Sequence, residues 1–144
     1  MKPSTLLAIT SVIALTACAA PIVPDEEYQS VSSASVSSAN PDITVSEPDP
    51  NVPVSSPLTV TGEARGGWYF EASFPVKLLD AGNNVIAQGP AQAQGDWMTP
   101  NFVPFSVILT FPPQTPQMGT LVLEKDNPSG EPQNDASVSI PVQL

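Results

Sequence analysis

The sequence contains no histidine and only one cysteine, Cys18. Without histidine the chain lacks the most common general base and the most common metal ligand. A single cysteine cannot form an intrachain disulfide or a cysteine-built zinc site. The sequence also has no Gly-x-Ser-x-Gly elbow and no P-loop, and Ser73 and Lys77 would lie more than about 12 Å apart along a strand. We therefore expect no catalytic residues, no cofactor and no enzymatic activity.

Positive charge is scarce. Four Lys and Arg residues stand against 14 Asp and Glu, which gives a formal net charge of -10. Such a surface repels phosphate backbones, so nucleic acid is not an expected partner. Charged residues make up only 12% of the 144, whereas 18 are proline and 8 are glycine. This composition favours a single domain of short strands separated by turns.

The longest apolar run, Leu6–Leu15, is too short to span a bilayer but has the length of a signal-peptide core. It leads into Leu15-Thr-Ala-Cys18, which resembles the lipobox of bacterial lipoproteins. We expect residues 1–17 to be a signal peptide and Cys18 to carry lipid that holds the protein on the extracytoplasmic face of the cell membrane. The alternative is an ordinary secretory signal cleaved near residues 17–20.

Residues 18–41 are predicted to be a flexible linker after the lipidated cysteine. Small and polar residues dominate, and the few apolar ones show no sustained period, so little surface could be buried to offset the cost of ordering. The acidic run Asp25–Glu27 fits a solvated charge cluster, with a docking or cation site as the alternative. Residues 42–144 remain as the globular domain.

Apolar and polar residues alternate with the period of half-buried strands throughout the globular part. Two examples are Leu58–Ala64 and Phe102–Phe111, and the alternation predicts about seven short strands in an antiparallel two-sheet β-sandwich of immunoglobulin-like type. The proline-rich connection 48–57 is expected along a sheet edge, and Pro75 at an edge or a bulge. The further predicted strands are 43–45, 68–79, 85–88, 91–94, 120–125 and 138–142.

Four stretches in order resemble a known family. They are Val54–Arg65, Trp68–Val76, Gly95–Trp97 and Gly119–Gly130, and they are similar to the immunoglobulin-like domain of bacterial spore-germination proteins, which often accompanies a GerMN domain. The resemblance covers about residues 42–144. In this sequence the predicted signal peptide and linker stand before these residues, in place of a GerMN domain. The resemblance implies an extracytoplasmic β-sandwich with a binding or assembly role, and it supplies no catalytic residues.

The candidates for a ligand platform are five aromatic residues: Trp68, Tyr69, Phe70, Phe74 and Trp97. Exposed rings bind sugars or peptides by stacking. Trp68 follows two glycines and Trp97 lies in a turn-rich segment, so these two are the residues we expect to reach solvent, with Tyr69 beside them. The alternative is that most of these rings belong to the core. Arg65, between Glu63 and Glu71, is either an anion clamp or one member of a surface ion pair.

The polar loop 126–135 contains oxygen ligands that calcium accepts, although turns use the same residues. Its candidate ligands are Asp126, Asn127, Glu131 and Asp135. An acid pair such as Asp80 and Asp96 would be needed for an envelope-polymer hydrolase, and the sequence does not place the two relative to each other.

Taken together, these features predict a lipid-anchored envelope protein with a non-catalytic binding or assembly module. Its expected partners are the membrane, through Cys18, and an envelope protein or glycan. The alternatives are a structural spacer without a dedicated ligand and an envelope-polymer hydrolase.

Overall fold

The computed structural model describes residues 40–144, which form seven β-strands and two short 3-10 helices. The predicted signal peptide, Cys18 and nearly all of the predicted linker lie outside the described residues. Within residues 40–144 no helix is long and apolar enough to cross a membrane. The elements are β1 (Ile43–Glu47), β2 (Leu58–Arg65), η1 (Gly66–Trp68), β3 (Ser73–Leu79), β4 (Val85–Ala93), β5 (Phe102–Leu109), β6 (Met118–Glu124), η2 (Pro132–Asn134) and β7 (Ser137–Gln143).

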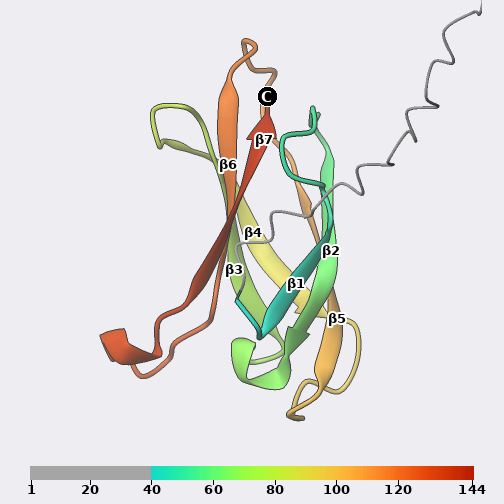
Figure 1. Cartoon of the computed structure of the whole chain (residues 1–144), viewed down its shortest axis with the longest axis vertical. Coiled ribbons are helices and arrows are strands. Elements are labelled where there is room, and N and C mark those ends of the chain that lie inside the picture. The colour runs from blue at the N-terminus through green and yellow to red at the C-terminus, as the bar shows by residue number, and fades with distance from the viewer. Residues whose placement is uncertain (1–39) are drawn as a thin grey trace, which may run out of the picture. The chain divides into compact units, whose positions relative to one another are not determined.

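All neighbouring strands pair antiparallel in one sheet, in the order β1-β2-β5-β4-β3-β6-β7. One wall contains β1, β2 and β5, and the facing wall contains β4, β3, β6 and β7 (Figure 1). Pairing of the second strand with the fifth and of the third with the sixth is typical of immunoglobulin-like folds. The all-β, immunoglobulin-like prediction is therefore confirmed.

The two walls are not separate sheets, because hydrogen bonding continues from β4 into β5. This corner ladder contains only two residue pairs, Gln92↔Ser106 and Ala93↔Phe105. On the other side, the proline-rich connection between β1 and β2 bonds to β7. The Gln143 N–H donates to the Val52 carbonyl at 2.9 Å, and the Val54 N–H donates to the Gln143 carbonyl at 2.8 Å. The sheet thus curls into a nearly closed barrel, and the expectation that this connection follows a sheet edge is confirmed.

The core fills the space between the walls, and strict alternation along each strand supplies it. In β5 every second residue from Val103 to Leu109 is buried, and β2 alternates in the same way. Because the domain has no disulfide to join its walls, aromatic rings do so instead. Phe74 meets Phe105 edge to face with ring centroids 5.0 Å apart, and Tyr69 lies 5.2 Å from Phe74. Such pairs contribute about 0.5–1.5 kcal/mol beyond their buried area.

Pro75 does not lie in an edge strand or at a bulge, contrary to the sequence-based prediction. It lies in β3, between β4 and β6, directly opposite Pro90 of β4. Neither proline has an N–H to donate. The pair therefore suits a position in the β3–β4 ladder where the backbone N–H and C=O groups of the two residues point away from each other. On the far side of Pro75 the ladder to β6 begins only at Val76. On the far side of Pro90 the ladder to β5 begins only at Gln92. Both prolines thus avoid a donor position.

The turn between β3 and β4 is organised by one carboxylate. Asp80 Oδ1 accepts hydrogen bonds from the backbone N–H groups of Gly82 and Asn84, both at 2.8 Å, and the Asn84 side-chain amide donates to Asp80 as well. These bonds, above all the one from the Asn84 side chain, hold the pKa of Asp80 below its usual value. The turn returns the chain into β4, which continues through Pro90 to Ala93 as one strand.

Candidate functional site

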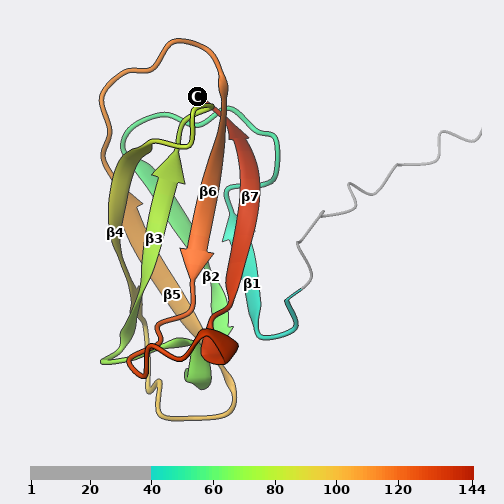
Figure 2. The same ribbon diagram turned by 90° about the vertical axis from the view of Figure 1, so that its left-hand side faces the viewer.

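An open cavity of about 460 Å³ lies at the end of the barrel where β2 ends and β5 and β7 begin. Segments far apart in the sequence meet there: the residues before β1, the η1 turn, the residues before β5 and the β6–β7 connection (Figure 2). We call it the end cavity. Its polar and charged lining includes Asp42, Arg65, Trp68, Lys125, Asn134 and Asp135.

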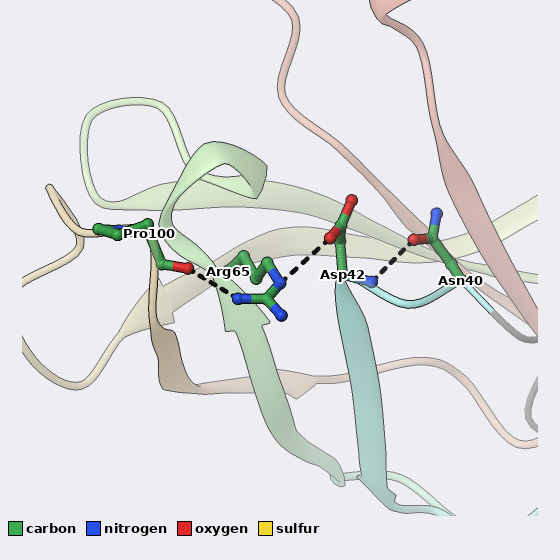
Figure 3. Close-up of polar contacts among 4 residues, drawn as sticks. All are labelled: Asn40, Asp42, Arg65 and Pro100. Carbon is green, nitrogen blue, oxygen red and sulfur yellow. Dashed lines mark hydrogen bonds and ion pairs between the residues drawn. The ribbon is translucent and has the colours of Figure 1, made fainter.

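Three contacts hold Arg65 at the rim of the end cavity, and Figure 3 shows the two polar ones, with Asp42 and Pro100. Its Nε lies 3.2 Å from Asp42 Oδ1, and one terminal nitrogen donates to the Pro100 carbonyl at 2.9 Å. The guanidinium also lies 4.5 Å from the centroid of the Phe102 ring. Arg65 thus forms a surface ion pair, and its partner is Asp42, the residue before β1. Because about half of each side chain is exposed, the pair contributes at most about 1 kcal/mol.

Lys125 is the second cation of the end cavity and was not predicted as a site residue. The described part of the chain contains three cations, and Lys77 pairs with Glu124 at 2.8 Å. Lys125 makes no ion pair within residues 40–144. Its backbone N–H donates to the Ala136 carbonyl at 2.8 Å, which holds it at the start of the β6–β7 connection. Two of the three described cations therefore line one cavity in a strongly acidic protein.

Trp68 is buried, with 2% of its surface exposed, so the expectation that it reaches solvent is wrong. The η1 turn places its ring against the core, edge to face with Phe74 at 6.3 Å. Trp68 also lines the end cavity. Among the buried side-chain polar atoms of residues 40–144, its indole nitrogen is the one without a hydrogen-bond partner. A buried donor without an acceptor costs about 1–3 kcal/mol.

Tyr69 is likewise in the core, with 4% of its surface exposed. Its hydroxyl donates to the Val103 carbonyl at 2.6 Å and so ties the segment after η1 to β5. Burial raises the pKa of Tyr69 to about 12, chiefly because the charged phenolate would lose its hydration. Neither Trp68 nor Tyr69 presents a ring face to solvent, so an aromatic platform that includes them has no structural basis.

Trp97 is half-buried and packs against the core from the β4–β5 connection. It does not line the end cavity. The backbone carbonyls of Trp97 and Thr99 approach Gly66 so closely that a Cβ atom there would collide with both. The Gly66 N–H also donates to the Asn101 carbonyl at 3.3 Å. This close packing fixes the connection against the end of β2.

The candidate calcium ligands lie in the β6–β7 connection, where Asn127 contacts both Glu131 and Asp135. Within the described residues no group of three or more acidic side chains is placed to hold a metal ion. Asn127 instead organises the loop, because its side-chain amide donates to the Glu131 carbonyl at 2.9 Å and to Asp135 Oδ1 at 2.7 Å. The residues that suggested calcium in the sequence are thus used as turn-forming residues.

Topology keeps apart Asp80 and Asp96, the example of an acid pair that a hydrolase would need. Asp80 precedes β4 and Asp96 follows it, so the nine residues of β4 separate them by roughly 30 Å. Two other carboxylates, Asp42 and Asp135, do line the end cavity. Each is already engaged, Asp42 by Arg65 and Asp135 by Asn127.

A second depression of similar volume lies over β3 and β4, around Pro75 and Pro90. Its cation, Lys77, is neutralised by Glu124 at 2.8 Å. The end cavity is therefore the stronger candidate site. It is lined by Lys125, which has no ion pair within residues 40–144, and by Trp68, whose indole nitrogen has no hydrogen-bond partner there.

Comparison with known protein families identifies a match. The family model Gmad2, described as the immunoglobulin-like domain of bacterial spore germination, matches residues 42–132. The chain belongs to this family. Membership identifies an immunoglobulin-like module related to spore germination, and the family description names no catalytic reaction. No curated protein and no solved structure matched the chain.

Proposed function

We propose that this protein is a lipid-anchored protein of the bacterial cell envelope whose Gmad2 domain acts as a non-catalytic binding module. The observation that carries the binding role is the end cavity, where four chain segments place two cations and the buried Trp68 around one open volume. Concave sites with a few convergent polar groups are the usual form of ligand sites. A spacer without a ligand would have no need of such an arrangement.

The anchoring role rests on Leu15-Thr-Ala-Cys18. Lipid chains on Cys18 would hold the protein at the membrane, since each buried methylene contributes about 0.8 kcal/mol. We expect the full-length chain to fractionate with membranes and its mature form to begin at a diacylglyceryl-modified Cys18, as measured by mass spectrometry. The Cys18→Ser chain should lack that modification. An unmodified thiol on the exported protein would contradict the proposal.

The binding role is tested in the cell that produces the protein. A photo-crosslinking phenylalanine analogue at Asn134 lies in the end cavity, and the same analogue at Thr115 lies on the connection between β5 and β6, at the opposite end of the barrel. Both native side chains are exposed, so the pair is matched. We expect mass-shifted adducts from position 134 and not from 115. Equal yields from both positions, or no adduct from either, would favour the spacer.

A further inference from the structure

Positively charged side chains are concentrated at the end cavity. The domain is acidic, yet two of its three described cations, Arg65 and Lys125, line this one volume. Arg65 is committed to Asp42, to the Pro100 carbonyl and to the Phe102 ring. Lys125 has no ion-pair partner within residues 40–144 and is the cation left for a ligand.

The second observation is the indole N–H of Trp68, which has no hydrogen-bond partner within residues 40–144. Trp68 lines the same cavity as Lys125, and its carbonyl accepts a hydrogen bond from Asp126, the residue after Lys125, at 3.1 Å. A lysine ammonium and an indole N–H are both donors, and neither can accept. A ligand that satisfies both must bring acceptors and negative charge.

We infer that the end cavity binds a small ligand or chain end through a carboxylate group. A carboxylate has two oxygens and a full negative charge, so one group can accept from the Lys125 ammonium and from the Trp68 indole. The indole nitrogen is covered from solvent, so this inference requires the residues over it to move when the ligand binds. Asn134 and Gln133, at the rim, add amide groups for the remainder of the ligand. This inference rests on the proposed binding function and specifies its ligand chemistry.

The test observes the Trp68 indole N–H directly. The full-length chain, isotopically labelled and purified in detergent, contains two tryptophans and so gives two indole N–H signals in the NMR spectrum. The Trp97→Phe variant assigns the remaining signal to Trp68. The probes are an acetylated alanine tripeptide with a free C-terminus, the same peptide amidated, glucuronate and glucose.

We expect a carboxylate probe to move the Trp68 signal downfield in a saturable titration, because the indole gains an acceptor. Its uncharged counterpart should leave the signal in place. The peptide pair and the sugar pair distinguish a peptide C-terminus from an acidic sugar. Lys125→Met should weaken the binding at least about tenfold, since a charge-assisted contact is lost. The matched control Lys77→Met should bind as the unaltered chain does.

Equal responses to the acid and its uncharged counterpart would overturn the inference. So would affinity unchanged by Lys125→Met, or no saturable shift with either acid. Failure of the inference differs from failure of the proposed function. Crosslinking confined to position 134, combined with silent carboxylate probes, would leave the binding role intact and reject only the ligand class.

Discussion

At the scale of single residues, two neighbouring buried side chains of this barrel differ in their hydrogen bonding. The hydroxyl of Tyr69 has its acceptor, the Val103 carbonyl, whereas the indole N–H of Trp68, the adjacent residue, has none in the described part of the chain. The two side chains share the same aromatic cluster around Phe74. Trp68 therefore stands out, because the same packing gives the Tyr69 hydroxyl an acceptor and gives the Trp68 indole N–H none among the described residues.

Tyr69 should make the domain sensitive to alkaline pH. The folded pKa of about 12 exceeds the ordinary value of 10, so the neutral phenol stabilises the fold fully below pH 10. That contribution, about 3 kcal/mol, is lost as pH rises from 10 to 12. Urea unfolding across this range should show the loss in the unaltered chain and not in Tyr69→Phe. Tyr69→Phe should itself cost about 1–3 kcal/mol at pH 7, because the Val103 carbonyl loses its donor. Parallel pH curves for both proteins would contradict this assignment.

At the scale of elements, the end of β2 and the β4–β5 connection are packed backbone to backbone. This contact depends on the absence of a side chain at Gly66, while the next residue, Gly67, has open space around it. The sequence shows two adjacent glycines and does not reveal which one the fold requires. The element that approaches Gly66 comes from about thirty residues further along the chain.

Gly66→Ala should therefore destabilise the domain, and Gly67→Ala serves as its matched control. A methyl group at Gly66 would collide with the carbonyls of Trp97 and Thr99, and relief of such overpacking typically costs about 1–3 kcal/mol. Gly67→Ala meets no atom within 4 Å and should change stability by less than about 1 kcal/mol in either direction. Thermal unfolding of the two variants measures the difference. Identical midpoints would mean that the connection does not pack on β2 as described.

At the scale of the whole molecule, the barrel closes along two unlike seams. One is the short β4–β5 ladder, and the other is the irregular segment around Val52 that bonds to β7. The second seam uses backbone groups of β7 that face away from β6. Closure therefore covers the outer edge of β7 at Pro141 and Gln143, which would otherwise be open for pairing with another chain.

Gln143→Pro tests the second seam. Proline removes the N–H that donates to the Val52 carbonyl, and no β6–β7 hydrogen bond is lost because that N–H points away from β6. Gln143→Ala keeps the N–H and loses the same side-chain bond to the Asn51 carbonyl, so it is the proper control. We expect Gln143→Pro to be about 1–3 kcal/mol less stable than Gln143→Ala in urea unfolding. Equal stability would show that the seam contributes nothing to the fold.

The sequence alone determined the fold class, the approximate strand positions and the family. Alternation along a strand is a local property, because successive side chains point to opposite faces, and it is readable without knowing the partner strand. The sequence also predicts the lipid-bearing cysteine, through a short motif that needs no tertiary context.

Only the tertiary structure decided the site. Trp68 was expected at the surface from its neighbours in the chain, yet it is buried by elements that come later. The ends of β2 and β6 and the starts of β1, β5 and β7 lie at one end of the barrel. For this reason Asp42 pairs with Arg65, and Lys125 lines the end cavity. Which strand ends lie together depends on the order of the strands in the sheet, and no local sequence pattern encodes that order.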